Sequence, residues 1–421
     1  MIRPFYSLVM SGFQPLLRHK LRRRGVAEPG YLQHVDERFG LYPQRSEGGH
    51  VWIHAVSLGE TRAAAILLEQ LRAQQPDVRV LLTHGTATGR AEGERLLRPG
   101  DAQAWLPWDT PQAVRRFLAH FKPRLGVLME TEVWPNLAAV CAEQGVPLVL
   151  ANARLSEKSM RQALRLARLS RPAYGALAAV WAQTEADARR LARVGARVDG
   201  VFGNLKFDAT PDPAQLACGR AWRQALDRPV VMFASSREGE EEAFFQAIAG
   251  HKGGGVQWLL VPRHPQRFAE VAALAVHHGL ALSRRSAWGG PPQGAELWLG
   301  DSLGEMALYY GMADVALLGG SFEPLGVQNL IEAAAAGCPV VMGPHTFNFA
   351  DAAQLAQDAG AALRVGTMAD AVGTAVALAG DRKRQHALAE AGLQFAASHR
   401  GAAQRTAAAL LALGQAQGKR P

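Results

Sequence analysis

The chain has 421 residues, enough for two domains, and its 48% hydrophobic and 20% charged residues describe an ordinary globular protein. Its three cysteines, Cys141, Cys218 and Cys338, are far apart, which argues against a disulfide framework and against a metal site built on cysteine spacing. The net charge of +9 predicts an anionic partner. No zinc pattern, RNA-binding aromatic signature or long basic block is present, so we expect no nucleic acid among its partners.

Residues 1–24 form a distinct first segment. The apolar stretch 5–17 is interrupted by polar residues and is shorter than the roughly 20 apolar residues that a spanning helix needs. Six basic residues follow it directly: Arg18, His19, Lys20, Arg22, Arg23 and Arg24. This combination predicts a helix that associates with one face of an anionic membrane leaflet. The alternative is a terminal helix that packs on its own domain and leaves its basic end in water.

From residue 51 onwards the chain alternates short apolar runs with amphipathic helical stretches, as parallel α/β sheets do. The expected strands of the first half are 51–56, 78–83, 104–107, 125–130, 146–151, 178–182 and 198–202. Those of the second half are 229–234, 257–261, 280–283, 296–299, 314–318 and 339–342. We therefore predict two doubly wound, Rossmann-like domains that face a central cleft. Their expected ranges are 25–208 and 229–421, with a linker at 209–228 and a final helix that can pack back on the first domain.

Glu60 follows the first expected strand and a Ser-Leu-Gly turn, near the first turn of a helix. Ligands of open α/β sheets bind at the carboxyl ends of the strands. A carboxylate there is either a general base or a helix-start residue that complements the dipole. We expect the dipole to keep Glu60 ionised, which also weakens it as a base.

Further polar clusters follow other strands of the first half. The Thr/Gly loop 83–89, which contains Thr86, can bind a sugar or a phosphate, although such loops are also common turns. Glu130 and Glu132 begin a loop before Pro135, either as acid/base groups or as ordinary residues of a helix start. Arg154 can bind a phosphate or carboxylate, or form a structural salt bridge.

The second half carries three such clusters. Ser235 lies in a loop that starts a helix, which predicts an anion site at backbone N–H groups. Arg263 and His264 lie between two prolines, either pre-positioned for a ligand or in a rigid surface turn. The segment 314–349 combines a Gly-Gly turn with Asn329 and Glu332, a pattern that suits a nucleotide. Dinucleotide and P-loop motifs are absent, as is any Asp-x-Asp for a metal-bound sugar diphosphate.

Seven blocks together resemble the Kdo transferases of lipopolysaccharide assembly, which add 3-deoxy-D-manno-octulosonic acid (Kdo) to a lipid A precursor. The blocks are residues 57–60, 130–137, 152–156, 203–208, 261–265, 300–305 and 342–349. They include Ser57 and occur in one order along nearly the whole chain. One departure is Gln328, which stands where many relatives have a histidine.

The resemblance implies a GT-B fold and an inverting, metal-independent transfer of Kdo from CMP-Kdo, without a cofactor. It places the acceptor on the first domain and CMP-Kdo mainly on the second. Together with the segment 1–24, it places the protein at the cytoplasmic face of the bacterial inner membrane. Glu60 matches the catalytic base, and Glu130 matches a second acid of the acceptor site. The nucleotide-contacting positions are Arg263, Asp301, Leu303, Gly304, Glu305, Asn329 and Glu332. Protein partners are not indicated.

These observations lead to a single-displacement hypothesis, in which Glu60 deprotonates a glucosamine 6′-hydroxyl that attacks the anomeric carbon of Kdo. Two alternatives are open: another GT-B enzyme such as a nucleotide-sugar epimerase, and a non-catalytic protein that retains the fold.

Overall fold

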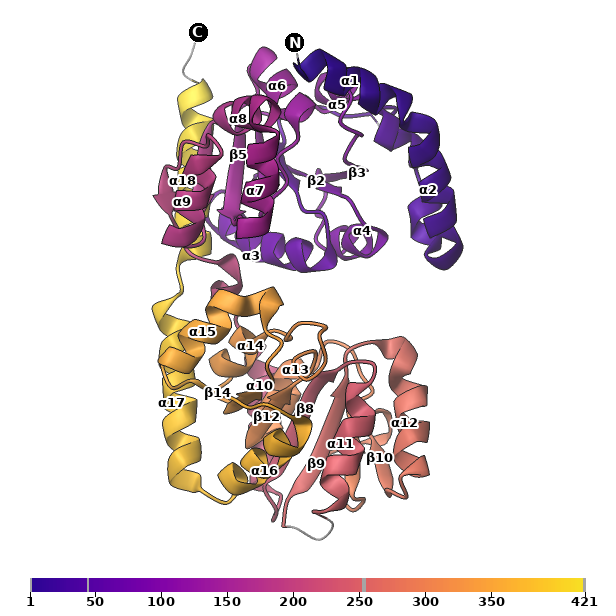
Figure 1. Ribbon diagram of the computed structural model, residues 1–421, viewed down its shortest axis with the longest axis vertical. Coiled ribbons are helices and arrows are strands. Elements are labelled where there is room, and N and C mark those ends of the chain that lie inside the picture. Colours follow the sequence, from indigo (N-terminus) through magenta and orange to yellow (C-terminus); the bar gives the residue numbers. More distant parts are fainter. Residues whose placement is uncertain (1, 44, 252–254, 419–421) are drawn as a thin grey trace. The chain divides into compact units, whose positions relative to one another are not determined.

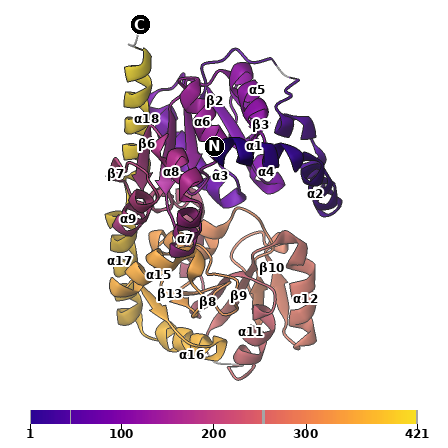
Figure 2. The same cartoon turned by 45° about the horizontal axis from the view of Figure 1, so that its top comes forward.

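The computed structural model describes residues 2–43, 45–251 and 255–418. The expected domain ranges also include residues 1, 44, 252–254 and 419–421, which lie outside the described residues. The chain divides into two compact units (Figures 1 and 2). The first comprises Met1–Asp208 and Arg400–Pro421, and the second comprises Ala209–His399. Each contains one seven-stranded sheet in which every ladder is parallel, which confirms the expectation of two parallel α/β domains.

The sheet of the first unit has the order β3-β2-β1-β4-β5-β6-β7. Its strands are β1 (Val51–His54), β2 (Val80–His84), β3 (Ala102–Trp105), β4 (Leu125–Met129), β5 (Leu148–Ala153), β6 (Ala179–Ala182) and β7 (Gly200–Val201). This is the doubly wound order of Rossmann-like domains, in which the direction of winding changes between β1 and β4. A ligand of this unit is therefore expected beyond the carboxyl ends of β1 and β4.

Side chains of the strands alternate between two hydrophobic layers. Trp52 lies in the layer formed with α5 (Pro111–Phe121), α6 (Pro135–Glu143) and α8 (Ala167–Gly175). Val51 and Ile53 lie in the opposite layer, with α3 (Leu58–Gln74) and α18 (Ala402–Gly418). This unit also contains α4 (Ala87–Glu94), α7 (Glu157–Arg165), α9 (Glu185–Arg193) and the short 3-10 turns η1 (Pro29–Leu32), η2 (Val35–Phe39) and η3 (Leu205–Asp208). Both faces of the sheet are thus buried.

The first segment forms two helices, α1 (Ile2–Gly12) and α2 (Gln14–Ala27). Polar contacts join α1 to the rest of the unit, because Tyr6 donates to Asp109 at 2.9 Å and Ser7 donates to Asn136 at 2.8 Å. Large apolar side chains of these helices are exposed, including Phe5 at 69% and Leu8 at 70%. Among the described residues, no helix is both long enough and apolar enough to cross a membrane.

The sheet of the second unit has the order β10-β11-β9-β8-β12-β13-β14. Its strands are β8 (Val230–Ser236), β9 (Gln257–Pro262), β10 (Leu282–Arg284), β11 (Leu297–Leu299), β12 (Val315–Leu318), β13 (Val340–Met342) and β14 (Ala362–Arg364). The helices are α10 (Pro213–Gln224), α11 (Glu240–Ala249), α12 (Phe268–His277), α13 (Met306–Met312), α14 (Leu330–Ala335), α15 (Ala350–Asp358), α16 (Met368–Ala379) and α17 (Arg382–Ser398), with 3-10 turns η4 (Pro265–Arg267), η5 (Arg285–Ala287) and η6 (Phe347–Phe349).

Two parts of this division differ from the sequence-based boundaries. Residues 209–228, expected as a linker, belong to the second unit and contain α10, which packs on α13 so closely that a Cβ on Gly219 would lie 2.1 Å from the Leu308 carbonyl oxygen. Residues 400–421 belong to the first unit, where Asp208 accepts the backbone N–H of Ala403 at 2.6 Å. The short edge strand β14 was not predicted.

Candidate active site

Glu60 lies in the first turn of α3, directly after β1. Ser57 caps this helix by accepting the Glu60 N–H at 3.4 Å. The Glu60 carboxylate in turn accepts the Val56 N–H at 2.9 Å and the Ser57 hydroxyl at 3.1 Å. These reciprocal bonds resemble a capping box. They hold the carboxylate in one orientation at the carboxyl end of β1, so Glu60 has the helix-start role, which does not exclude a catalytic one.

The pKa of Glu60 is raised from its ordinary 4.5 to about 7. Burial is the largest cause, and the negative charges of Glu130 and Glu132 raise the pKa further. The Val56 N–H and the Ser57 hydroxyl oppose the rise only in part. The expectation that Glu60 stays ionised and weakly basic is therefore wrong, because burial raises its pKa despite its position at a helix N-terminus. A pKa near neutrality is suited to general-base catalysis.

Glu130 follows β4 and is 4% exposed. Its backbone adopts a φ of +59°, which is uncommon for a residue with a side chain and is typical of sites held by their surroundings. Arg154 lies 2.7 Å from one carboxylate oxygen and Lys206 lies 3.6 Å from the other. Of the two roles open for Arg154, the structure shows the salt bridge.

Glu132 is a member of this carboxylate group that sequence reasoning noticed but did not select. Its carboxylate accepts the indole N–H of Trp134 at 2.9 Å. Burial raises its pKa, and the charge of Glu130 adds to the rise. The signal in the sequence is the Glu-x-Glu spacing at the end of β4, which places a second acid next to the first.

Thr86 caps α4 by accepting the Gly89 N–H at 3.1 Å, and its hydroxyl donates to the Val56 carbonyl at 3.0 Å. Gly89 is required at this position, because a Cβ there would lie 2.9 Å from the Val56 carbonyl oxygen. The Thr86 hydroxyl thus fixes the loop after β2 against the loop after β1, whereas the Ser57 hydroxyl bonds within its own loop and helix start. The structure assigns them local partners and does not test the ligand-binding role expected for them.

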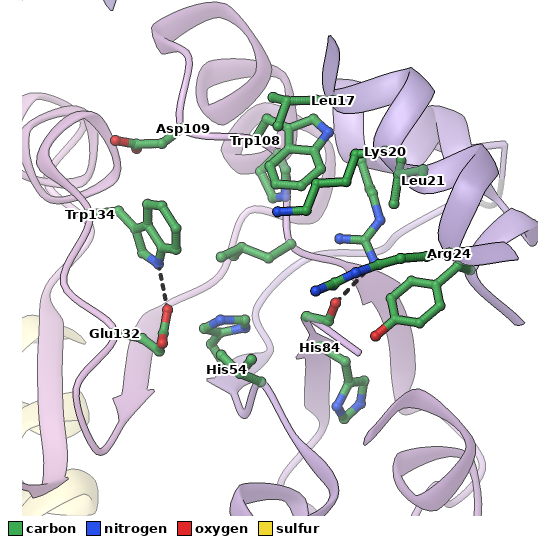
Figure 3. A pocket seen from close by; sticks show the side chains of 16 residues that line it. Leu17, Lys20, Leu21, Arg24, His54, His84, Trp108, Asp109, Glu132 and Trp134 are labelled. Atoms are coloured by element: carbon green, nitrogen blue, oxygen red, sulfur yellow. Dashed lines mark hydrogen bonds between the residues drawn. The ribbon is translucent and has the colours of Figure 1, made fainter. Parts of the chain in front are cut away.

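A cavity of about 250 Å³ lies in the first unit beside these loops, between α2 and the carboxyl ends of the strands (Figure 3). Val56 and Glu132 line it, whereas Glu60 does not. Its wall also includes Lys20, Arg24 and Arg38. Sequence reasoning missed the cavity because α2, η2 and the loop after β3 contribute to it from distant parts of the chain.

In the second unit, Ser235 lies near the end of β8 with a φ of +58°. The loop after β12 passes close to it, since a Cβ on Gly319 would lie 2.2 Å from the Ser235 carbonyl oxygen. Arg263 donates its backbone N–H to the Ser236 carbonyl at 3.0 Å. Burial lowers the pKa of the adjacent His264, and nearby arginines lower it further. The structure therefore brings Ser235 and the Arg263 loop together at one sheet edge.

Glu240, the first residue of α11, binds backbone groups beside the expected anion site. Glu240, which is fully buried, accepts the backbone N–H groups of Arg237, Gly320 and Phe322 at 2.8–3.0 Å. Only the Arg237 amide belongs to the loop before α11, so the anion site expected at this helix start stays a prediction. The carboxylate joins the Gly-Gly loop to α11.

Asp301 and Glu305 are held by arginines of the same unit. Asp301 accepts Arg284 at 2.8 Å and both the N–H and the hydroxyl of Ser286 at 2.8 Å. Burial opposes ionisation, but these bonds together lower the pKa of Asp301. Glu305 accepts Arg285 at 2.7 Å. Between them, Leu303 is 69% exposed and Gly304 has a φ of +79°, so this turn presents backbone and an apolar side chain to solvent.

Asn329 begins α14, and Glu332 lies in its first turn. The side-chain oxygen of Asn329 is buried without a hydrogen-bond partner among the described residues. Gln328 donates its backbone N–H to the Gly319 carbonyl at 3.0 Å, which fixes α14 beside the end of β12. Asn329 therefore carries an unused acceptor at the carboxyl edge of the sheet. In the described part of the chain, no cluster of His, Cys, Asp and Glu is arranged to hold a metal ion.

Comparison with known families gives a consistent result. The family described as 3-deoxy-D-manno-octulosonic-acid transferase (kdotransferase) matches residues 33–209. The 3-deoxy-D-manno-octulosonic acid transferase of Bordetella pertussis is 48% identical, over 97% of this chain and 98% of that protein. The Haemophilus influenzae protein of the same name is 33% identical, over 96% of this chain and 97% of that protein.

Solved structures show the same fold at low sequence identity. A glycosyltransferase from Rickettsia africae is 12% identical with a TM-score of 0.57, covering 89% of this chain and 100% of its own. A putative UDP-N-acetylglucosamine 2-epimerase from Listeria monocytogenes is 14% identical with a TM-score of 0.58, covering 87% of this chain and 97% of its own. These likenesses concern the fold alone, whereas the full-length relatives show that the chain belongs to the Kdo transferase family.

Proposed function

We propose that this chain transfers Kdo from CMP-Kdo to the 6′-hydroxyl of a lipid A precursor during lipopolysaccharide biosynthesis, with inversion at the anomeric carbon and without a metal. Family membership supports the transfer of Kdo. The observation that carries the mechanism is Glu60, an oriented carboxylate with a pKa of about 7 at the carboxyl end of β1. It is the group in the first unit best suited to accept a proton from a hydroxyl at neutral pH.

The proposed step is a single displacement. Glu60 takes the proton of the 6′-hydroxyl while the hydroxyl oxygen bonds to the anomeric carbon of Kdo. The bond from that carbon to the phosphate oxygen of CMP breaks, and CMP leaves as a phosphate monoester with the bonding electrons. Arg263 is proposed to stabilise the charge on this leaving group. Glu130, with Arg154 and Lys206 as counterions, contributes a fixed negative charge that keeps the pKa of Glu60 high.

The donor is proposed to bind in the second unit. Support comes from the approach of Ser235, Arg263 and Asn329 to one sheet edge, and from the unused side-chain oxygen of Asn329. Asp301 and Glu305 serve this proposal mainly as supports, because arginines of the same unit already bind their carboxylates. The exposed Leu303–Gly304 backbone between them, His264 and Glu332 complete the proposed nucleotide contacts.

We further place the protein on the cytoplasmic face of the inner membrane. The exposed side chains of Phe5 and Leu8 lie three residues apart on α1, so both lie on one face of the helix. The basic residues of α2 follow directly, and each cation near an anionic leaflet contributes roughly 1 kcal/mol. This arrangement supports a helix pair that lies on the membrane surface.

The deciding experiment incubates purified protein with CMP-Kdo and a tetra-acylated, bis-phosphorylated glucosamine disaccharide lipid, then identifies the lipid product by mass spectrometry. A mass increase of one or more Kdo units is expected, and it should persist when EDTA is present. Inversion is checked by NMR of the new anomeric centre. An unmodified lipid, together with turnover of a nucleotide sugar to its epimer, would identify the epimerase alternative, and inactivity on both would favour a non-catalytic protein.

A further inference from the structure

Arg38 is a buried cation without a counterion. It lies in η2, is 3% exposed, and forms no ion pair with any described residue. Its guanidinium donates one hydrogen bond, to the Gly85 carbonyl at 3.1 Å, while its Nε atom has no partner. The negative charge of the neighbouring Glu37 raises the pKa of Arg38, but its carboxylate is bound by Arg90 at 2.7 Å. A buried charge that forms no ion pair of its own is costly, so the binding of an external anion beside it is favoured.

The guanidinium is held in position by aromatic rings. It lies 3.9 Å from the ring centre of Trp105 and 5.4 Å from that of Trp108. Burial lowers the pKa of Arg38 to about 10, which still leaves it charged at neutral pH. The indole N–H of Trp108 is a second buried donor without a partner, and both residues line the same cavity. The cavity is thus lined by two residues that each have a buried donor without a partner.

The other groups of the cavity divide it into two sides. Lys20 and Arg24 reach it from α2, and Figure 3 shows Glu132, Trp134 and Asp109 opposite them. The two carboxylates are already bound: Glu132 accepts Trp134, and Asp109 accepts Tyr6 and the backbone N–H groups of residues 136 and 137. Burial lowers the pKa of His54 to about 3 and of His84 to about 4, so both rings are neutral. At neutral pH the positive charge of the cavity therefore comes from its lysine and arginines and not from its histidines.

The apolar surroundings identify the kind of molecule that carries the anion. Leu17, Leu21 and two tryptophans line the cavity, and the adjacent Phe13 and Leu16 are 51% and 61% exposed. A small inorganic anion would gain no binding energy from contact with these apolar side chains. A phosphorylated sugar attached to acyl chains would place its charge at Arg38, its ring over the tryptophans and its chains along the exposed face of α1 and α2.

We propose that Arg38, together with Lys20 and Arg24, binds a phosphate monoester on the sugar headgroup of the acceptor lipid. The proposal rests on the function proposed above and assigns the cavity to one part of its acceptor. Arginine suits this role because its planar guanidinium can bond two phosphate oxygens at once. α2 then has two roles, since its Lys20 and Arg24 close the headgroup site while other side chains of the same helix pair meet the membrane.

The test measures equilibrium binding without the donor, so it does not depend on catalysis. The probes are the bis-phosphorylated disaccharide lipid in neutral detergent micelles, the same lipid after phosphatase treatment, and inorganic phosphate as competitor. Tryptophan fluorescence reports binding, because Trp108 and Trp134 line the cavity. The wild-type protein is expected to prefer the phosphorylated lipid about 10- to 100-fold, as charged hydrogen bonds contribute roughly that much. Arg38→Met should remove most of this preference.

A matched pair of double variants separates a site from general charge attraction. Lys20→Gln with Arg24→Gln should reduce the preference about tenfold, whereas Arg22→Gln with Arg23→Gln should leave it intact. Both pairs remove two charges from the same helix, but only the first pair lines the cavity. Equal losses in the two pairs would overturn the proposal, as would a wild-type preference near one. Displacement of the lipid by an equal concentration of inorganic phosphate would assign the site to free phosphate instead.

A melting curve of Arg38→Met distinguishes binding from structure. Removing an uncompensated buried charge should leave the melting temperature unchanged or raise it. Two results together would overturn the proposal and make Arg38 a structural residue. They are a large fall in the melting temperature of Arg38→Met, and a phosphate preference that the Lys20→Gln/Arg24→Gln variant retains. Failure of the proposed function is recognised separately: the wild-type protein would then transfer no Kdo while still preferring the phosphorylated lipid.

Discussion

The carboxylates of two candidate site regions, one in each unit, differ in how their surroundings change their pKa. In the first unit, Glu60 and Glu132 are crowded near Glu130, and burial raises the pKa of both. In the second unit, Asp301 is tied to Arg284 and Ser286, and these bonds lower its pKa despite burial. With a pKa of about 7, Glu60 can exchange protons near neutral pH, whereas the bonds to Asp301 favour its ionised form and hold its loop in place. The difference supports the proposal that acid/base chemistry belongs to the first unit and donor binding to the second.

The cations show the same contrast. Arg38 of the first unit is buried without a counterion, while Arg267 of the second unit lies 2.6 Å from Glu241 and 2.8 Å from Glu270. One arginine is available for an external anion, and the other is neutralised by the chain itself. The comparison predicts that substitutions in the first unit mainly reduce activity and that equivalent substitutions in the second unit mainly reduce stability.

The largest expected effect is that of Glu60→Gln. The amide keeps the shape of the side chain and can still accept the Val56 N–H, but it cannot take a proton. Turnover should fall about 10²- to 10⁴-fold, the usual contribution of a general base. The matched control is Glu69→Gln, an exposed residue on the same helix, which should retain normal turnover. Wild-type turnover by folded Glu60→Gln would exclude Glu60 as the base.

The converse prediction concerns Glu240→Ala in the second unit. The carboxylate accepts three buried backbone N–H groups, which would be left unsatisfied. The free energy of unfolding should fall by about 3 kcal/mol, taking roughly 1 kcal/mol for each group. Urea denaturation followed by fluorescence measures this loss, with the exposed Glu390→Ala on α17 as control. Unchanged stability would show that the second unit does not depend on its carboxylates as the comparison requires.

A smaller effect is expected at the exposed face of α1. Phe5→Ser combined with Leu8→Ser should weaken co-sedimentation with anionic vesicles about tenfold or more, because each exposed apolar side chain can bury its surface in the interface. These substitutions are sharper than removal of residues 1–24, which would also delete the Tyr6–Asp109 contact and one wall of the cavity. Leu166→Ser, at a 64% exposed leucine outside α1 and α2, is the control. Undiminished vesicle binding would argue for a helix that only packs.

Much of this fold could be predicted because buried parallel strands read as short apolar runs. The runs at 51–56 and 125–130 correspond to β1 and β4, so Glu60 and Glu130 could be placed at strand ends. The three-residue edge strand β14 was not predicted, because the alanine-rich stretch that contains it continues directly from α15 and lacks the β-branched apolar residues typical of strands.

The partners of the site residues could not be predicted in the same way. Whether burial or the helix dipole decides the pKa of Glu60 depends on how closely other chain segments cover it. The pairing of Asp301 with Arg284 joins the loop after β11 to the end of β10, and the burial of Arg38 depends on tryptophans about 70 residues away. None of these contacts has a periodic or local signature in the sequence.

The finest test of the comparison is the pH profile. If Glu60 is the base, kcat/KM should rise with pH through about 7, because only the deprotonated form accepts a proton. Glu132→Gln removes one of the charges that raise the pKa of Glu60, so the rising limb should move to lower pH, while Glu69→Gln should not move it.

The free energy of unfolding should change with pH in the opposite direction to kcat/KM. A carboxyl group whose pKa rises from 4.5 to about 7 on folding binds more protons in the folded chain, so the free energy of unfolding should fall as pH rises between these values. Glu60→Gln should remove that part of the slope, and an unaltered slope would mean that Glu60 titrates alike in the folded and unfolded chain.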